Sequence, residues 1–237
     1  MNYAIDRRAL TAAANAADPY GGHQPTSGYL QPGIPGYEPA AIYPLRKPEL
    51  ARALRLAGGT IRHGVIYGYT LPPGPQLAQI VKTDLAAIGI EMDIKLFGKV
   101  AMYNRILNPN EPWDIALAGW GVDHPDPSDE INALFDSSSI PPVPLPPNAA
   151  NLYFNYGRFS DPAFDRRMRA AATLSGTPRQ RTYGQLAIDL ARDAAPAAAW
   201  GVPDSRNLFA TRIGCQTDQP IYGFDLATLC LRRPRRG

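Results

Sequence analysis

Three polar side chains, Asp123, His124 and Asp126, lie close together in the sequence and are of the types that bind metal ions. Their setting, D-H-P-D-P, is also what a tight turn prefers, because Asp and Pro favour turn geometry. The other histidines, His23 and His63, lie far away, and no two histidines have the i, i+4 spacing of a helical zinc site. We therefore favour a turn here and expect neither a metal ion nor a cofactor.

The sequence lacks the motifs of the common enzyme sites. Neither glycine-rich phosphate-binding loop, G-x-x-x-x-G-K-[ST] or G-x-G-x-x-G, occurs, and the G-x-S-x-G elbow of serine hydrolases is absent. No nucleophile is paired with a candidate base. We expect a binding protein and not an enzyme.

Size and charge narrow the class of protein further. The 237 residues carry a net charge of +3, and four arginines fall in the last seven residues, so the rest of the chain is at −1. That balance argues against a nucleic-acid partner. The 25 prolines predict stiff loops and short helices. No apolar run is long enough to span a membrane, and the opening MNYAIDRRAL lacks the apolar segment of a signal peptide.

Apolar spacing divides the chain into helices and strands. Helices are expected at 3–17, 47–58, 75–87, 102–107, 131–135, 162–174 and 178–193. Strands are expected at 61–70, 90–97, 113–120, 197–202 and 208–213, with long loops at 18–44 and 137–147. This alternation predicts an α/β fold with a mixed sheet flanked by helices. The first helix begins near Met1 without a cap, which suggests a helix cut in its middle.

Several segments, taken in chain order, resemble one family. They are NYAIDR at 2–7, GIPGY at 33–37 with Tyr43-Pro44, LAAIGI at 85–90, WDIA at 113–116, GWGVD at 119–123 with Asp126-Pro127, Asn155 with Phe159 and DPAFD at 161–165, and Arg181, Tyr183 and 194–196. Together they resemble the family 5 extracellular solute-binding proteins, the oligopeptide, dipeptide and nickel receptors of ABC importers. The chain departs from the family in lacking the V-R-x-A-L stretch before the first motif and in having Phe159 where tyrosine is usual.

The resemblance implies an architecture. Residues 1–237 would form a single α/β lobe of a periplasmic-binding-protein type II clamshell, with 205–237 as a C-terminal return segment and arginine tail. Family members are roughly twice as long, so we expect the first lobe to be missing and the chain to be a fragment, a truncated reading frame or one half of a split gene. The implied partners are a peptide or small amine-bearing solute, the missing N-terminal lobe and an ABC importer permease. The implied location is periplasmic or extracellular and membrane-associated.

The resemblance also implies a substrate-binding site. Asp123 corresponds to the aspartate that pairs with a peptide's free α-amino group, and at the end of a buried strand, where water is scarce, that bond would be strong. Trp120 would supply a flat apolar surface, and Gly119 and Gly121 would let the ligand backbone approach. Asn155 completes the expected site. Each main member also has a structural interpretation: Trp120 as core, Asp123 as a turn residue and Asn155 as a loop brace.

Cys215 and Cys230 are the only cysteines of the sequence. The oxidising location that the resemblance implies favours a disulfide between them. Two buried thiols, packed as small apolar side chains, are the alternative in a reducing compartment.

Two functions remain open. The first is the substrate-binding component of an ABC importer for peptides or related amine-bearing solutes, in which the lone lobe binds poorly because closure needs both lobes. The alternative is a stand-alone α/β interaction module that binds another protein through its exposed face.

Overall fold

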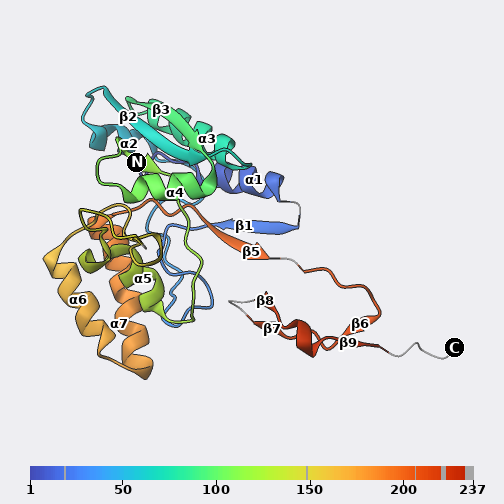
Figure 1. Ribbon diagram of the computed structural model, residues 1–237. Helices are drawn as coiled ribbons and strands as arrows, with labels where there is room; N and C mark the ends of the chain where they lie inside the picture. Colours follow the sequence, from blue (N-terminus) through green and yellow to red (C-terminus); the bar gives the residue numbers. More distant parts are fainter. Residues whose placement is uncertain (19, 148, 206, 220–222, 233–237) are drawn as a thin grey trace.

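The computed structural model describes residues 1–18, 20–147, 149–205, 207–219 and 223–232. Its helices are α1 (Arg7–Ala17), α2 (Leu50–Ala57), α3 (Gly74–Ala86), α4 (Lys99–Leu107), α5 (Pro127–Phe135), α6 (Pro162–Ala172) and α7 (Gly176–Asp189), with a π-helical turn at Leu190–Ala194 after α7. Its strands are β1 (Gly21–Pro25), β2 (Arg62–Tyr69), β3 (Ile90–Phe97), β4 (Ile115–Ala116), β5 (Gly201–Ser205), β6 (Ile213–Gly214), β7 (Asp218–Gln219), β8 (Gly223–Phe224) and β9 (Cys230–Leu231). Figure 1 shows two halves, which we call the sheet half (α1–α4 with β2–β4) and the helical half (α5–α7).

A three-stranded parallel sheet forms the centre of the sheet half. Strand β2 lies between β3 and β4 and is parallel to both. The alternation expected at 90–97 is confirmed in β3, where Met92 is buried between two exposed acidic residues. In β2, Ile66 packs into the core cluster that contains residues of α3, while Tyr67 packs with Met102 of α4. Helices therefore cover both faces of this sheet, as is usual for parallel strands.

An antiparallel ribbon of β1 and β5 lies beneath α1 in Figure 1. Its register runs from Gly21 opposite Ser205 to Pro25 opposite Gly201. The expectation of an irregular loop over 18–44 is therefore wrong at β1, and the strand expected at 197–202 begins only at Gly201. The α/β fold class is confirmed, although the described parallel and antiparallel pairs lie in separate small sheets and not in one mixed sheet.

The helical half is organised by helix caps. Asp126 and Asp161 each accept hydrogen bonds from the first turn of the following helix, and each precedes a proline, a residue well suited to that turn. The start expected at 162 is confirmed, whereas α5 begins four residues before the expected 131. Its core contains Ile131, Met168 and Tyr183, one residue from each helix.

The beginning of the chain corrects one expectation. Helix α1 does not start at residue 3 without a cap: it starts at Arg7, and the Asp6 side chain accepts hydrogen bonds from the backbone N–H groups of Arg8 and Ala9. Because this end is a complete N-cap, the inference of a helix cut in its middle was wrong.

Two expected strands are much shorter in the structure. Within the apolar run 113–120, strand β4 comprises only Ile115 and Ala116, and of the run 208–213 only Ile213 belongs to a strand, β6. The apolar residues of both runs have other partners, such as the Trp113 side chain in the cluster around Tyr67 and Phe209 against Phe224. An apolar run reports burial or packing, and without alternation it does not specify a sheet.

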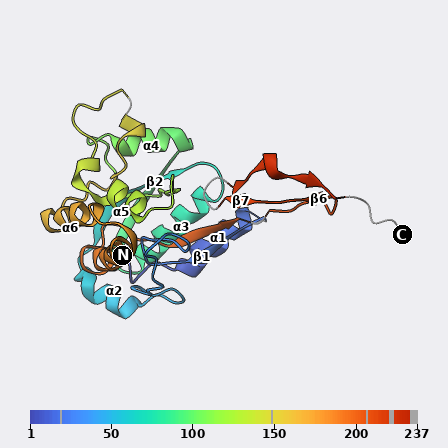
Figure 2. The same ribbon diagram turned by 90° about the horizontal axis from the view of Figure 1, so that it is seen from below.

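The last described segment, 207–219 with 223–232, forms an arm that projects from the body in Figures 1 and 2. Strand β6 pairs with β9 and β7 with β8, both antiparallel. Cys215 and Cys230 are joined by a disulfide across this arm, with their Cα atoms 5.4 Å apart. Of the expected return segment at 205–237, residues 206, 220–222 and 233–237, with most of the arginine tail, lie outside the described residues.

Candidate functional site

The GWGVD segment leaves the sheet directly after β4. The Leu117 N–H still donates to the Tyr67 carbonyl at 2.8 Å, continuing the pairing with β2 by one residue. At Gly119 the partner becomes a side chain: the Tyr103 hydroxyl of α4 accepts from the Gly119 N–H at 3.0 Å and donates to the Gly119 carbonyl at 3.2 Å. Tyr103 thus takes the place of a continuing strand, so that 119–123 form a loop at the seam of the two halves.

A cavity of about 630 Å³ lies at this seam. Ile5 and Val81 of the sheet half and Leu134 of the helical half contribute to its wall, together with Gly119 and Trp120. The Trp120 ring packs edge-on against Phe154, with the ring centroids 4.7 Å apart. The wall is largely apolar and aromatic, so the space favours apolar ligand groups over charged ones.

Gly121 and Asp123 follow Trp120 on the exposed side of the loop. We expected the Asp123 carboxylate where water is scarce, and in this chain it is exposed. The reason is that the segment before it is a loop with only a two-residue strand, so no sheet buries its end. Exclusion of water from Asp123 would need a further surface placed over the loop.

Asn155 also lines the cavity, and its side chain is fully engaged with backbone. Its amide nitrogen donates to the carbonyls of Asp136 and Phe159, and its amide oxygen accepts from the Phe159 N–H at 2.9 Å. The residue is buried, and these bonds close the loop between η-turn Ser137–Ser139 and α6. This geometry is that of a loop brace.

Asp129, which the sequence did not single out, joins the expected site residues. Its Oδ2 atom accepts from the Trp120 indole Nε1–H at 3.3 Å and from the Asp123 backbone N–H at 2.8 Å. Its Oδ1 atom lies 3.4 Å from His124 Nδ1. Asp129 therefore brings Trp120 and Asp123 together, while the described residues around the D-H-P-D-P turn form no cluster able to hold a metal ion.

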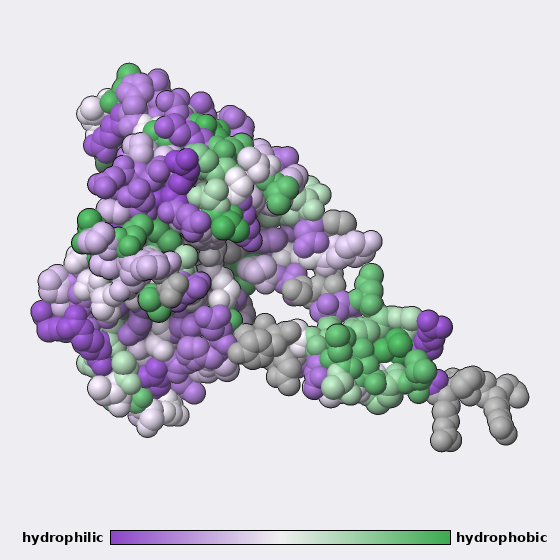
Figure 3. All heavy atoms as spheres, in the orientation of Figure 1, coloured by the Kyte–Doolittle hydropathy of each residue, from purple (hydrophilic) through white to green (hydrophobic). Residues whose placement is uncertain are grey.

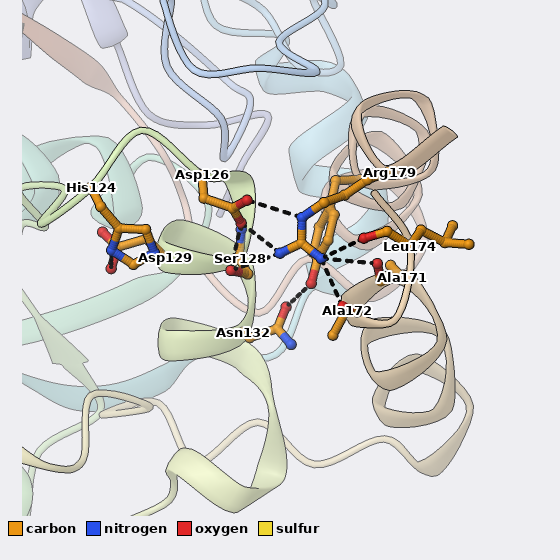
Figure 4. Close-up of polar contacts among 10 residues, drawn as sticks. His124, Asp126, Ser128, Asp129, Asn132, Ala171, Ala172, Leu174 and Arg179 are labelled. Atoms are coloured by element: carbon orange, nitrogen blue, oxygen red, sulfur yellow. Dashed lines mark hydrogen bonds and ion pairs between the residues drawn. The ribbon is translucent and has the colours of Figure 1, made fainter. Parts of the chain in front are cut away.

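Arg179 was not anticipated either, and it fixes the helix that carries Asp129. Figure 4 shows its guanidinium between two helix ends. It binds Asp126 with both a 2.9 Å and a 2.7 Å hydrogen bond, and it donates to the carbonyls of Ala171, Ala172 and Leu174 at the end of α6. The bidentate pairing with Arg179 holds the pKa of Asp126 far below its ordinary value. The only sequence signal for this cluster was the pair Asp126-Pro127, a typical start of a helix.

Glu130, next along α5, is buried and accepts from the Gln31 N–H at 3.3 Å. Burial raises the pKa of its carboxyl from 4.5 to about 7. Between these values the folded chain holds a proton that the unfolded chain has lost, so the free energy of unfolding falls as the pH rises from 4.5 to 7.

Glu130→Gln is therefore expected to raise the free energy of unfolding near neutral pH by about 1–3 kcal/mol, and to have little effect below the unfolded pKa. Urea denaturation across this pH range measures it. The exposed Glu38→Gln variant is the control. A Glu130→Gln gain that is the same at every pH would contradict the buried, titrating carboxyl.

Several solved structures share the fold of this chain. HbpA2 from Haemophilus parasuis has a TM-score of 0.75 at 19% identity over 98% of this chain and 44% of its own. The ABC transporter-associated periplasmic binding protein DppA from Helicobacter pylori, in complex with the peptide STSA, has a TM-score of 0.66 at 20% identity over 96% of this chain and 44% of its own. The oligopeptide-binding protein AppA from Bacillus subtilis, in complex with a nonapeptide, has a TM-score of 0.69 at 17% identity over 98% of this chain and 46% of its own. These likenesses show that the chain has the α/β fold of a part of these three proteins.

The family follows from the sequence. Residues 1–141 match the model of the bacterial extracellular solute-binding proteins, family 5 (middle part), and the chain belongs to that family. No curated protein sequence matches it. The chain spans less than half the length of the solved proteins above. No helix in the described part of the chain is both long and apolar enough to cross a membrane.

Proposed function

We propose that this chain is the ligand-contacting lobe of an ABC importer's substrate-binding protein, and that its ligands are peptides or related amine-bearing solutes. The observation that carries the proposal is that Trp120 and Asp123 are held next to each other by a shared partner, Asp129. One carboxylate oxygen of Asp129 binds both residues, and Trp120 forms part of the wall of an apolar cavity. The indole faces apolar ligand groups, and the Asp123 carboxylate accepts hydrogen bonds from a protonated amine. Gly119 and Gly121 leave room for the ligand backbone, and Asn155 holds the loop without touching the ligand.

The ligand completes the site by drawing a second lobe over it. The solved relatives are more than twice as long as this chain, and two of them are complexes with peptides. A ligand that contacts both lobes only when they are closed shifts the population toward the closed form. Closure also removes Asp123 from water, which strengthens its bond to an amine.

The arm is the surface on which the first lobe packs. Leu208, Leu226 and Leu231 are 81%, 76% and 73% exposed, and the visible face of the arm is largely apolar in Figure 3. Isolated exposed leucines are common. An arm whose visible face is largely apolar, and which is cross-linked by a disulfide, favours a partner that covers it. The same exposed arm favours the second candidate function, a stand-alone module that binds another protein.

The partners outside the protein follow from the family. We propose a periplasmic or extracellular location, where the Cys215–Cys230 disulfide persists, and delivery of ligand to an importer permease. One solved relative is described as an ABC transporter-associated periplasmic binding protein, which supports this assignment.

Titration calorimetry with a pool of di- to pentapeptides tests the proposal. The chain alone is expected to bind weakly or not at all, because half of the closed site is contributed by the other lobe. The chain combined with the first lobe encoded upstream in frame, or by a neighbouring gene, is expected to bind. Tight binding by the chain alone would contradict the half-site, and a gene with no first lobe beside it would favour the stand-alone module.

A further inference from the structure

We propose that Asp129 is the positioning residue of the ligand site, whose carboxylate fixes the indole of Trp120 and the backbone of Asp123 in one arrangement before the ligand arrives. The inference rests on the proposed function for its effect on binding, but the arrangement itself can be measured in the chain alone.

One carboxylate oxygen of Asp129 accepts hydrogen bonds from two residues of the expected site. Asp129 Oδ2 accepts from Trp120 Nε1 at 3.3 Å and from the Asp123 N–H at 2.8 Å. Because both donors converge on the same oxygen, the position of the indole and that of the Asp123 backbone are coupled through Asp129. His124 Nδ1 lies 3.4 Å from the other carboxylate oxygen.

The hydrogen bonds from Trp120 and Asp123 also stabilise the buried carboxylate of Asp129. The Asp129 side chain is only 8% exposed, and a buried carboxylate without hydrogen bonds costs considerable free energy. Release of the loop from Asp129 is therefore unfavourable, and the loop is held rigid. A site held in its binding geometry loses less conformational entropy when the ligand binds.

The support behind Asp129 is rigid as well. Asp129 lies in the first turn of α5, where its N–H donates to the Asp126 carbonyl at 3.0 Å. Asp126 in turn is clamped by Arg179 to the end of α6 (Figure 4). A continuous series of contacts thus runs from the α6–α7 packing to Trp120.

A matched control separates positioning from general stabilisation. Asp165 is also a buried carboxylate in the first turn of a helix, and it accepts from the N–H and hydroxyl of Ser137 at 3.0 and 2.6 Å. It contacts no expected site residue in the described hydrogen bonds. Asp165→Ala should therefore destabilise the chain much as Asp129→Ala does, without altering the site.

Fluorine NMR of the chain labelled with 5-fluorotryptophan measures the arrangement directly. The chain has three tryptophans, and Trp120→Phe assigns the resonance of interest. We expect Asp129→Ala to move the Trp120 resonance, because the indole loses its acceptor, and Asp165→Ala to leave it in place. Asp129→Asn keeps the side-chain volume and one carbonyl oxygen, so it preserves the fold and should give a smaller shift. An unmoved Trp120 resonance in both Asp129 variants overturns the proposal.

The second measurement is the peptide affinity of the two-lobe protein, by which we mean this chain combined with the first lobe. Asp129→Ala is expected to weaken binding by about tenfold or more, Asp129→Asn to restore most of that loss, and Asp165→Ala to change it little. Equal losses in Asp129→Ala and Asp165→Ala overturn the positioning role. A wild-type two-lobe protein that binds no peptide contradicts the proposed function instead, and the fluorine result then still supports or overturns the role of Asp129 in the loop.

Discussion

Replacement of Arg7 by alanine is expected to lower the free energy of unfolding by about 3–5 kcal/mol. Arg7 is only 1% exposed. Its Nε–H is shared between the carbonyls of Thr26 and Ala199, at 3.0 and 2.8 Å. Its two terminal nitrogens donate to the carbonyls of Asn2 and Pro44 and to the Asn2 side chain.

The size of the effect follows from how many segments Arg7 joins. Four stretches of chain that are distant in sequence meet on one guanidinium, and each buried carbonyl left without a donor costs about 1–3 kcal/mol unless water replaces it. Burial lowers the pKa of Arg7 to about 10, so the side chain stays charged near neutral pH. Arg7→Lys should recover only part of the loss, because an ammonium cannot reproduce the planar fork.

Urea denaturation of Arg7→Ala, Arg7→Lys and Arg8→Ala measures this prediction. Arg8 is the exposed neighbour on the same helix, and its replacement should change the free energy of unfolding by no more than about 0.5 kcal/mol. Arg7→Ala with a loss as small as that of Arg8→Ala would show that the surrounding carbonyls find water without cost.

The sequence pattern predicted the position of those helices and strands whose signals lie within the element itself. The apolar residues at 90, 92, 94 and 96 alternate, and β3 occupies the expected residues. Helices α3 and α6 begin within a residue of their expected starts, because apolar spacing and the D-P cap are local signals. Helix α2 ends at Ala57, one residue before the expected end at 58, and Gly58 caps it in the left-handed conformation.

Elements that depend on distant partners could not be predicted. The GGHQP segment of β1 has no strand pattern, and it is a strand because β5 lies beside it. The run 113–120 has the apolar content of a long strand, but Tyr103 of α4 occupies the backbone groups of Gly119 and ends the pairing. The identity of that partner cannot be read from the run itself.

Some residues of the candidate site could likewise be predicted from the sequence, and others could not. Trp120 and Asp123 were found from a motif within one short segment, and the structure brings both to one carboxylate. Asp129 and Arg179 were missed, because an acidic residue in a first helical turn and an arginine on a helix surface are common features. Their roles depend on contacts among α5, α6, α7 and the loop at 119–123, which only the fold reveals.

Asp123→Asn in the two-lobe protein is expected to weaken the binding of peptides with a free α-amino group by about 2–5 kcal/mol. The carboxamide has nearly the same size, but it lacks the charge that we propose pairs with the ligand's ammonium group. N-acetylated peptides carry no such charge, so their affinity should change little. Asp136, whose carboxylate caps the turn at Ser137–Ser139, offers a control, and Asp136→Asn should leave the ratio of the two affinities unchanged.

The most direct test of the ligand assignment is therefore the titration of wild-type and Asp123→Asn two-lobe protein with one peptide in its free and N-acetylated forms. Recognition of the amine by Asp123 predicts a large loss for the free peptide and little change for the acetylated one. Equal losses for the two forms would show that Asp123 is a structural turn residue and would contradict the assignment.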